Sequence, residues 1–550
     1  MSNGAPTRVV ILGGGFAGVT MAMELGRLAR GDRDVNVHLV SNENYFVFQP
    51  LLPEVVACRI EPSHIINPVR QLCRNAHVTR AAIREVDLTA RRVRLVDSDA
   101  KRELDVDYDM LVVALGVTMD LSRIPGMREH ALPIKNLGDA FHLRNHVLRK
   151  LEEADHELDE ERRRRMLTFV AVGGGFSGVE TVAELNDMVK GVLRYYRRAR
   201  DTGHRMVLVH SRDRILNELE PGLAEFAQRK LQQRGVELVL GTHVAECTGG
   251  GVVLTNGAEI VSDTVVCTVG NSPHPVITGT RFPQERGRIL VDECLRVKGL
   301  PGVWALGDCA MVPDVKRGGF CPPTAQYALR QGKQCARNVY AAIRGGHARP
   351  FVFAGLGQLA VVGHRCGVAQ LPAGIKISGL LAWVLWRSVY WWKLPGARAK
   401  MRVGIDWALD LFFPRDIAML DVQRTELLGR AHYKKGEVMV RQGEIGDRFY
   451  VIERGEVEVV RENNGREEVL AQRTAGESFG EIALMRNTPR TATVRCLTPV
   501  DVISFSREDF RALVGSSETF RALFEGQVRA MEPDSSHTPA ATPEADSTQP

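Results

Sequence analysis

The sequence predicts an α/β fold in which one strand–glycine–helix unit occurs twice, followed by an all-β roll. Two stretches indicate the repeated unit: "RVVILGGGFAGVTMAMEL" from Arg8 and "TFVAVGGGFSGVETVAEL" from Thr168. Each runs from a short apolar segment through spaced glycines into a helix-like stretch. The roll is indicated by short alternating runs between Gly and Asn turns, as in "RFYVIERGEVEVVRENNGREEVLA".

Each copy of the repeated unit carries the pattern GxGxxG between its apolar run and its helix. The glycines of the two patterns are Gly13, Gly15, Gly18, Gly173, Gly175 and Gly178. Glycine is needed there because a pyrophosphate must approach the backbone closely, and the following helix directs free N–H groups at that anion. Two copies predict two dinucleotides, with FAD on the N-terminal copy and NAD(P)H on the inserted copy, as in two-dinucleotide-binding flavoproteins.

Other positions are expected to contact these cofactors. Asp308, at a strand end in "LPGVWALGDCA", can accept hydrogen bonds from flavin ribitol hydroxyls. Ser41, with Glu43 two residues on, stands where an acid for the adenosine ribose is expected. Ser211 and Arg212 hold that place in the second unit, and the arginine can accommodate a 2′-phosphate, so NADH or mixed use is the hypothesis. The remaining expected contacts are Ala17, Ala114 and Gly116 for FAD and Gly270 for NAD(P)H.

The composition is that of a globular chain with a mild basic excess. The 550 residues are 25% charged and 44% hydrophobic, with a net charge of +6, and we expect no nucleic-acid partner. The ten cysteines form no CxxC pair and no Cys/His cluster with zinc spacing, so buried lone thiols and no metal site are expected. No 18-residue run lacks charges, so we expect no membrane span, and the N-terminus shows no secretion leader.

A segment between Lys376 and Trp407 contains five of the six tryptophans. Its other notable residues are Tyr390, Arg387, Lys393, Arg398, Lys400 and Arg402. Interfacial helices combine aromatic and aliphatic anchors with basic residues that meet anionic headgroups. Because Arg387 and Lys393 interrupt the apolar run, the segment is expected to lie on a bilayer of anionic lipids rather than cross it. A pair of core helices with exposed basic residues is the alternative.

Three stretches occur in order along the chain: "ENYFVFQPLLPEVVA" (Glu43–Ala57), "PPTAQYALRQGKQCARN" (Pro322–Asn338) and "SGLLAWVLWRSVYWWKLPGARAKMRVGIDWALDLFFPRD" (Ser378–Asp416). Together they resemble the type II NADH dehydrogenases, the single-chain NADH:quinone oxidoreductases. The resemblance implies a peripheral enzyme of the respiratory chain on the cytoplasmic face of the cell membrane. In that family a hydride passes from NAD(P)H to FAD and electrons pass on to a membrane quinone.

The resemblance also implies roles for individual residues. Ala325 and Gln326 would line the flavin and quinone side, and Gln331 would lie in the same pocket. Glu180 would lie near the stacked nicotinamide and flavin, where it could relay protons; an ordinary helix-start charge is the alternative. The family usually has two adjacent glutamines where this chain has Arg330 and Gln331, which leaves the choice of acceptor open.

The stretches "GEIGDRFYVIERGEVEVV" (Gly443–Val460) and "FGEIALMRNTPRTATV" (Phe479–Val494) resemble cyclic-nucleotide-binding domains. A short helix near Gly480 can present N–H groups to a cyclic phosphate, and Arg490 can add a charge-assisted hydrogen bond. Glu481 can hold the ribose 2′-hydroxyl, with Ile482 beside it. Thr491 stands where Ala is frequent in cAMP-selective members and Thr in cGMP-binding ones, so cAMP is favoured and cGMP stays open. A roll that has lost its ligand is the alternative.

The expected order of domains follows from these features. It is FAD-binding (1–125 and 287–370), NAD(P)H-binding (126–286), an amphipathic membrane-binding segment (371–418), a cyclic-nucleotide-binding domain (419–530) and a disordered tail (531–550). The stretch "EEADHELDEERRRRM" is expected to be one solvated helix that connects the lobes. A homodimer is left open.

Two other functions stay in view. One is a flavin-dependent reductase for another acceptor such as sulfide, for which Cys309 and Cys321 are the candidate thiols. The other is a redox and cyclic-nucleotide sensor with little turnover. A disulfide reductase is not expected, because the nearest candidates for a redox pair, Cys58 and Cys73, are separated along the chain.

Overall fold

The computed structural model describes residues 5–97, 102–419, 429–444, 446, 448–463, 466–486, 489–506 and 510. The chain divides into two compact units, Met1–Leu420 and Asp421–Pro550. The predicted disordered tail, residues 531–550, lies outside the described residues.

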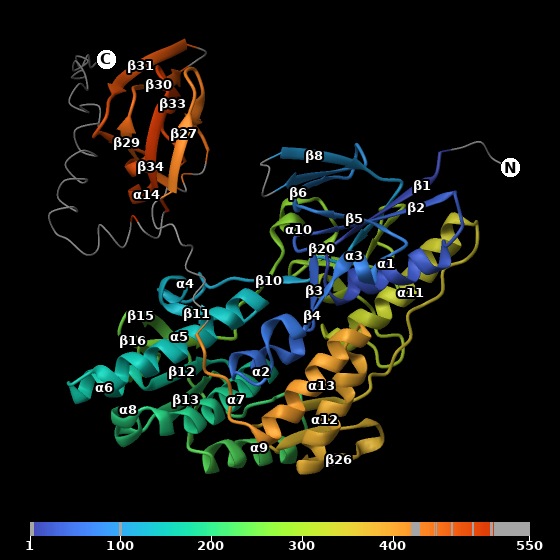
Figure 1. Ribbon diagram of the computed structural model, residues 1–550. Coiled ribbons are helices and arrows are strands. Elements are labelled where there is room, and N and C mark those ends of the chain that lie inside the picture. Colours follow the sequence, from blue (N-terminus) through green and yellow to red (C-terminus); the bar gives the residue numbers. More distant parts are fainter. Residues whose placement is uncertain are drawn as a thin grey trace, which may run out of the picture. The chain divides into compact units, whose positions relative to one another are not determined.

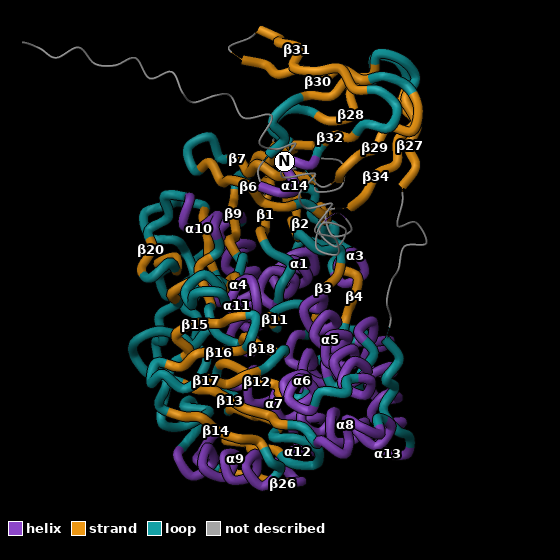
Figure 2. The backbone as a smooth tube through the Cα atoms, turned by 90° about the vertical axis from the view of Figure 1, so that its left-hand side faces the viewer, coloured by secondary structure: helices purple, strands orange, loops and turns teal. Residues whose placement is uncertain are grey.

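Two five-stranded parallel sheets form the centre of the first unit (Figure 1). The first sheet has the order β22–β9–β1–β2–β5, from strands Val303–Ala305, Met110–Val113, Thr7–Leu12, Val35–Ser41 and His77–Arg80. The second has the order β11–β18–β12–β13–β14, from strands Ala131–Pro133, Thr264–Cys267, Thr168–Val172, Arg205–His210 and Val236–Leu240. Figure 2 shows the strands of the second sheet stacked in this order, with α9 (Pro221–Gln233) beyond β14. The second sheet is inserted in the chain between β9 and β22.

The strands of these sheets are near-continuous apolar runs because helices cover both faces. All five residues of β12 are buried, as are the last four of β1. The main helices around the two sheets are α1 (Phe16–Leu28), α11 (Ala325–Ile343), α5 (Leu137–His156) and α7 (Phe176–Val192). The α/β dinucleotide-binding fold expected from the sequence is therefore present.

Smaller sheets and short helices complete the first unit. The small sheets are β6–β7–β8 (Ala82–Asp87, Arg92–Asp97, Arg102–Asp107), β15–β16–β17 (Val244–Thr248, Gly251–Leu254, Glu259–Val261), β20–β21–β23 (Gln284–Glu285, Arg288–Leu290, Ala310–Met311), β24–β25–β26 (Gln358–Val361, Gly367–Gln370, Lys376–Gly379), β10–β19 (Val117–Met119, Asn271–Pro273) and β3–β4 (Tyr45–Val47, Ile66–Pro68). The short helices are α2 (Leu52–Val56), α3 (Val69–Leu72), α4 (Met127–His130), α8 (Arg197–Thr202) and α10 (Pro275–Gly279).

The charged stretch before the second fingerprint forms two helices, so the prediction of one was wrong. The first, α5, ends at His156, and α6 spans Glu160–Met166. Asp159 caps α6 by accepting hydrogen bonds from the backbone N–H groups of Glu161 and Arg162, at 2.9 and 3.1 Å. A side chain that caps a new helix here competes with continuation of the old one. No residue of α6 is buried, as expected for a solvated helix.

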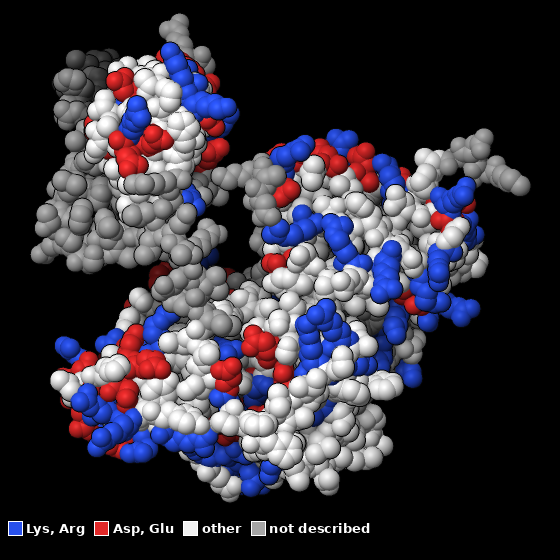
Figure 3. Space-filling model, viewed as in Figure 1, with Lys and Arg blue, Asp and Glu red and all other residues white. Residues whose placement is uncertain are grey.

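The aromatic–basic segment forms β26 and two helices that pack against each other, α12 (Leu380–Lys393) and α13 (Ala397–Phe412). None of the described helices combines the length and apolar character that a bilayer span requires. Many apolar side chains of the pair are nevertheless exposed: Leu380, Leu381, Val384, Trp391, Trp392, Met401, Ile405, Leu409, Leu411, Phe412 and Phe413. Figure 3 shows an uncharged area over α12 and β26.

Not every tryptophan of this segment is an exposed anchor. Trp383, Trp386 and Trp407 are buried in the core of the first unit, whereas Trp392 is 76% exposed. Arg387, which the sequence suggested as a contact for headgroups, is also buried. One face of the segment therefore packs as core, and the other exposes apolar side chains, while binding to a bilayer stays a prediction.

The second unit contains two four-stranded antiparallel sheets. Their strands are β27 (Gly429–Tyr433), β28 (Val438–Val440), β29 (Arg448–Arg454), β30 (Val457–Asn463), β31 (Arg466–Arg473), β32 (Ser478–Phe479), β33 (Thr493–Cys496) and β34 (Val500–Ser506). The orders are β27–β34–β29–β32 and β28–β33–β30–β31, and a short helix, α14 (Glu481–Arg486), follows β32. Alternating side chains fill the space between the sheets, which gives the roll predicted from the sequence.

Candidate functional site

Two adjoining cavities lie over the first glycine fingerprint, with volumes of about 190 and 440 Å³. Both are lined by Gly13, Gly14, Gly15, Phe16, Gln49 and Leu115. The smaller one reaches Asp308 and Ala325, and the larger one reaches Ser41 and Glu43. Together they form an elongated site that runs across the carboxyl ends of β1 and β2, where this fold binds dinucleotides.

The fingerprint glycines show why larger side chains are excluded here. A Cβ on Gly18 would lie 1.9 Å from the carbonyl oxygen of Gly13, so helix α1 could not approach the turn. Gly13 itself has a φ of +112°, which disfavours any other residue. Gly15 differs, because a Cβ there would meet no protein atom within 4 Å. The space beside Gly15 is therefore open to a ligand and fits a pyrophosphate at the start of α1.

Asp308 lines the smaller cavity together with Lys135. Burial raises the pKa of Asp308, while nearby Lys135 and Arg288 oppose that rise. A carboxylate in this position can accept hydrogen bonds from the hydroxyls of a ribitol chain. Ala17, Ala114 and Gly116 line the same cavity. These residues fit FAD.

Two polar residues of this site were missed by the sequence reasoning. Gln49 lines both cavities, and its side-chain amide donates to the backbone oxygen of Lys135 at 3.3 Å. Lys135 also lines the smaller cavity, where burial lowers its pKa and Asp308 opposes that effect. Neither residue belongs to a spaced motif. Gln49 could have been noticed only as the polar residue inside "YFVFQPLL".

The second fingerprint repeats the geometry of the first. Gly173 has a φ of +118°, and a Cβ on Gly178 would lie 1.8 Å from the carbonyl oxygen of Gly173. A Cβ on Gly175 would meet no protein atom within 4 Å, so the start of α7 is open in the same way. Ser211 and Arg212 follow β13 and are both exposed.

Gly270 lies just before β19, where the chain passes close to the backbone of Asp120. It has a φ of +92°, and a Cβ there would lie 2.5 Å from the backbone oxygen of Asp120. The β10–β19 pair continues from this point, because Met119 pairs with Asn271. Gly270 thus allows the two segments to approach closely.

The two glutamines that were expected beside the flavin, Gln326 and Gln331, bind different parts of the backbone. Gln326 turns away to the loop before β24, where it accepts from the N–H of Leu356 at 3.0 Å and donates to the oxygen of Gly357 at 3.1 Å. Gln331 is buried and accepts a hydrogen bond from the N–H of Gly307 at 2.8 Å. It is not among the residues that line the two flavin-side cavities, and its place in a flavin and quinone pocket stays a prediction. Gln331 positions the turn that carries Asp308.

Glu180 lies on the first turns of α7 and is only 7% exposed. Its Oε1 atom accepts hydrogen bonds from the N–H of Val361 and from Nε1 of Trp386, both at 3.0 Å. Burial raises the pKa of Glu180 to about 8, although these two donors oppose the rise. The raised pKa favours the protonated carboxyl near neutral pH, and its burial distinguishes Glu180 from a solvated charge at a helix start.

A second buried carboxyl, Glu54, binds α12 and α13 to α2. It accepts from Nε1 of Trp407 at 2.5 Å and from Arg387 at 3.4 Å. The Arg387 guanidinium lies 4.1 Å from the ring centre of Trp383 and 4.8 Å from that of Trp407. Arg387 is thus enclosed by aromatic rings and paired inside the protein, so it cannot also meet a lipid headgroup.

The cysteines bear on the alternative acceptors. All ten are free, and all but Cys294 are buried. Burial raises the pKa of both Cys309 and Cys321 to about 11, and that of Cys73 to about 12. Because the thiolate is the reactive form, these residues are poor nucleophiles at neutral pH. Among the described residues no group of His, Cys, Asp or Glu is arranged to hold a metal ion.

The predicted cyclic-nucleotide residues come together in the second unit. Arg490 is buried, and its guanidinium donates to the backbone oxygens of Gly480 at 2.9 Å and Arg448 at 2.6 Å. Glu481 begins α14, is buried, and has one carboxylate oxygen without a hydrogen-bond partner among the described residues. Burial raises its pKa. Ile482 is half-buried and Thr491 is exposed.

Comparisons with known families agree with this division. The family model described as pyridine nucleotide-disulphide oxidoreductase matches residues 7–332, and the NDH2 C-terminal domain matches residues 356–416. The cyclic nucleotide-binding domain matches residues 430–517. The first match covers more than half of the chain.

Curated relatives match about three quarters of this chain and most of their own length. The chain is 30% identical over 454 residues to a mitochondrial internal alternative NAD(P)H-ubiquinone oxidoreductase of Arabidopsis thaliana, covering 76% of this chain and 86% of that protein. It is 31% identical over 412 residues to a demethylphylloquinone reductase of Synechocystis, covering 73% and 96%. It is 28% identical over 424 residues to the type II NADH:quinone oxidoreductase of Mycobacterium tuberculosis, covering 74% and 89%.

Solved structures share the fold. NDH2 from Plasmodium falciparum, in complex with NADH, has a TM-score of 0.70 at 19% identity and covers 75% of this chain and 99% of its own. The sulfide:quinone oxidoreductase of Aquifex aeolicus has a TM-score of 0.55 at 16% identity and covers 76% and 100%. The fold alone does not separate these activities, but the sequence relatives and the C-terminal domain match do. The chain therefore belongs to the pyridine nucleotide-disulphide oxidoreductase family and, within it, to the type II NADH dehydrogenases, which are NADH:quinone oxidoreductases, with a cyclic nucleotide-binding domain following the redox unit.

Proposed function

We propose that the first unit binds FAD at the first fingerprint and NADH at the second, reduces a membrane quinone, and is regulated by cAMP bound to the second unit. The observation that carries the redox part is the pair of matched glycine turns, each open to a ligand at Gly15 and at Gly175. Bound FAD supplies the chemistry that takes a hydride from the nicotinamide and gives two electrons to the quinone.

The chain's own residues position these reactants and hold protons. The two helix starts bind the pyrophosphates, and Asp308 orients the ribitol chain. Gln331 fixes Gly307 and so sets the direction of Asp308. Glu180, protonated near pH 7, can supply one of the protons that quinone reduction consumes.

The acceptor assignment rests on two observations beyond the fold. The named relatives include reductases of ubiquinone and demethylphylloquinone. The exposed apolar side chains of α12 and α13 provide a surface suited to a membrane, where such quinones are dissolved. The buried, high-pKa thiols of Cys309 and Cys321 do not favour the sulfide alternative.

The proposed function is tested by mixing the FAD-loaded chain anaerobically with NADH and then with a soluble quinone analogue. Rapid bleaching of the flavin followed by rapid recovery supports the proposal. Rapid bleaching with negligible recovery would indicate another acceptor, and slow change in both steps would indicate the sensor. Parallel steady-state rates with NADPH decide the cofactor: a strong NADPH preference would contradict the proposed NADH or mixed use.

Replacing Glu180 with glutamine is expected to remove a pH dependence. If Glu180 supplies a proton, the wild-type rate of flavin reoxidation by quinone should fall as the pH rises through about 8, the pKa of this carboxyl. The Glu180→Gln variant keeps an oxygen acceptor for Val361 and Trp386, and its rate should be lower and flat across this range. Stopped-flow absorbance from pH 6 to 10 measures this. The exposed Glu225→Gln change is the control, and a high-pH decline that persists in Glu180→Gln would contradict the role.

The same variant also changes how the free energy of unfolding depends on pH, and the direction of that change follows from the raised pKa. The folded-state pKa of Glu180 lies above the unfolded value of about 4.3, so the contribution of the protonated carboxyl is fully present at low pH. It is lost as the pH rises towards about 8. The wild type should therefore lose stability relative to Glu180→Gln over this interval.

Removal of the Arg490 guanidinium is expected to weaken cyclic-nucleotide binding. A hydrogen bond to a charged group contributes about 1.5–3 kcal/mol, so Arg490→Gln should weaken cAMP binding by about 10- to 100-fold. Arg454→Gln removes an exposed charge from the same roll and should bind normally. Calorimetry on the full chain measures both. If neither cAMP nor cGMP binds to the wild type, the regulatory part of the proposal fails.

A further inference from the structure

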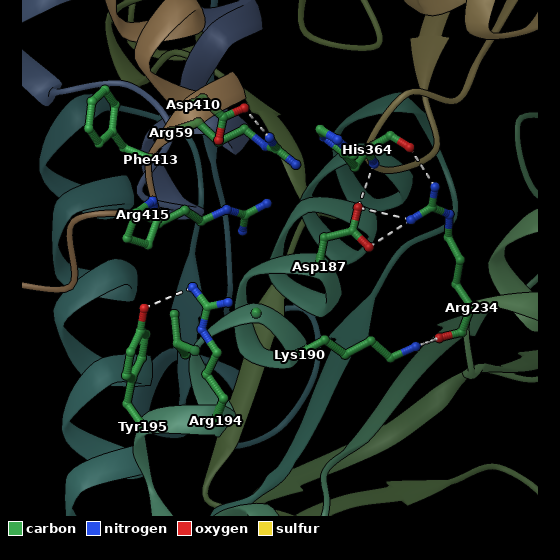
Figure 4. Close-up of a pocket in the computed structure, with 13 residues that line it drawn as sticks. Arg59, Asp187, Lys190, Arg194, Tyr195, Arg234, His364, Asp410, Phe413 and Arg415 are labelled. Atoms are coloured by element: carbon green, nitrogen blue, oxygen red, sulfur yellow. Dashed lines mark hydrogen bonds and ion pairs between the residues drawn. The ribbon is translucent and has the colours of Figure 1, made fainter.

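A cavity of about 560 Å³ lies apart from the cofactor sites, between the C-terminal end of α7, the turn η3 (Leu193–Tyr195) and the segment after α13 (Figure 4). It shares no lining residue with the two flavin-side cavities. Its charged lining residues are Arg59, Asp187, Lys190, Arg194, Arg234, Asp410 and Arg415. Cations exceed carboxylates in this lining, so the cavity carries an excess of positive charge.

Both carboxylates of the lining are already neutralised. Asp187 accepts from the guanidinium of Arg234 at 2.7 Å, and Asp410 is ion-paired with Arg59. The Nε of Arg59 also donates to Glu184 at 2.6 Å, from behind the cavity. These pairs leave no carboxylate of the lining to balance the other cations.

Three cations of the lining form no direct ion pair with a carboxylate of the described residues. Lys190 donates to the backbone oxygen of Arg234, and Arg194 donates to the hydroxyl of Tyr195 at 2.8 Å, both of which are neutral acceptors. Arg415 follows α13 and faces Arg59 without an ion pair. Figure 4 shows the guanidinium groups of Arg59, Arg415 and Arg194 one below another along one side of the cavity.

Two of these guanidinium groups also have enclosed N–H groups with no acceptor. Arg59 is only 6% exposed, yet its Nη2 atom has no hydrogen-bond partner in the described part of the chain. The same holds for Nη1 of Arg415. Burial and the neighbouring charge of Arg59 lower the pKa of Arg415, although the charges of Glu184, Asp410 and Asp187 oppose this effect. Enclosed donors without acceptors are costly, and an anion with several oxygens would satisfy both.

One edge of the cavity is apolar. Phe413, which is 63% exposed, lines it directly. Phe412 and Leu409 precede it on α13 and are also exposed. A ligand in the cavity could therefore place a charged group on the arginines and an acyl chain along α13.

We propose that this cavity binds the phosphate group of an anionic membrane phospholipid, with Arg59, Arg415, Arg194 and Lys190 around the phosphate and Phe413 against the glycerol and acyl region. Arginine suits this role because its planar donors match phosphate oxygens. The lipid as the source of the phosphate rests on the proposed peripheral position on a membrane. A specific headgroup site would fix the register in which the redox unit sits on the bilayer.

An adjoining cavity of about 430 Å³ shares Arg59 and Arg415 but does not suit an anion. Its lining includes the four acids Glu61, Asp406, Asp410 and Asp416. Their charge favours the first cavity as the place of the phosphate.

The test compares Arg415→Gln with Arg398→Gln in the full, FAD-loaded chain. Arg398 is exposed at the start of α13 and does not line the cavity, so both variants lose one charge from the same segment. The probe is a short-chain phosphatidylglycerol, with inorganic phosphate in a second arm, measured by calorimetry. Arg415→Gln should bind phosphatidylglycerol about tenfold or more weakly, and Arg398→Gln should bind it like the wild type.

Stability and activity separate this result from misfolding and from the redox proposal. Arg415→Gln removes an enclosed, unpaired cation next to Arg59, so its melting temperature should not fall. Flavin reduction by NADH should also be unchanged, and lipid binding can be read even if the quinone proposal fails. Vesicles of phosphatidylcholine, with and without phosphatidylglycerol, test the effect on a membrane by co-sedimentation.

Three outcomes would overturn the inference. Equal weakening in both variants would indicate general surface charge rather than a site. Phosphatidylglycerol binding that Arg415→Gln does not change would place the lipid elsewhere. Inorganic phosphate bound as tightly as phosphatidylglycerol would identify a free anion, and not a lipid, as the ligand.

Discussion

Replacing Gly175 with alanine is expected to weaken NADH binding, so that reduction of the flavin requires more NADH while the flavin itself stays bound. Gly175 has ordinary extended backbone angles, and a Cβ there would meet no protein atom within 4 Å, so the variant should fold normally. The added methyl would occupy the space where the pyrophosphate approaches α7. Overpacking costs about 1–3 kcal/mol, which is about 5- to 150-fold in NADH affinity. Stopped-flow bleaching of the flavin at increasing NADH concentration measures the loss.

The same substitution in the first fingerprint should have a different result. Gly15→Ala introduces the methyl at the start of α1, again without contact to protein atoms. Here the flavin should be lost, so the ratio of flavin absorbance to protein absorbance in the purified chain should fall. Gly15→Ala therefore tests the FAD site and Gly175→Ala tests the NADH site, each by adding one methyl group.

Two control changes define what these results mean. Gly191→Ala alters the same helix as Gly175 at an exposed position with open space, and should change neither flavin content nor NADH reduction. Gly178→Ala should instead destabilise the fold, because its Cβ would lie 1.8 Å from the oxygen of Gly173. Normal NADH reduction in Gly175→Ala together with normal flavin content in Gly15→Ala would contradict both cofactor assignments.

Removal of the Arg387 guanidinium is expected to destabilise the first unit strongly. Arg387 is 8% exposed and is paired with Glu54, which has no access to solvent that could replace this partner. Breaking a buried pair by removing one member typically costs about 3–5 kcal/mol. Arg387→Leu should therefore lower the free energy of unfolding by about this amount, even though the segment as a whole resembles a surface helix pair in sequence.

The tryptophans provide a selective measurement of this effect. All six lie in the first unit, so tryptophan fluorescence during urea unfolding reports on that unit and not on the roll. Arg398→Gln, an exposed change, should shift the free energy by less than about 0.5 kcal/mol. The double variant Glu54→Gln with Arg387→Leu should be less destabilised than the sum of the single variants, since neither charge is left unpaired. A small effect of Arg387→Leu would mean that Arg387 faces solvent or lipid instead.

The glycine fingerprints predicted the redox architecture because each fingerprint specifies one short turn between a strand and a helix. The open positions Gly15 and Gly175 and the strand-end carboxylate Asp308 lie where their motifs placed them. Gly18 and Gly178 are required by the carbonyl oxygens of Gly13 and Gly173, which are close to them in the sequence. A sequence motif says less about the direction of a side chain. Gln331 supports Gly307 rather than lining the cavity, because a helix position alone does not state which neighbouring backbone group is free to bind.

The sequence by itself determined the two dinucleotide units, the order of the segments, the likeness to the type II NADH dehydrogenases and the β-roll that follows them. Only the tertiary structure decided which charges are internal. Arg387 and Glu54 meet across α12 and α2, and Arg59 and Arg415 meet at a cavity although they are far apart along the chain. The physical reason is that the environment of a charge depends on the burial and partners supplied by distant segments, whereas a turn depends on its own few residues.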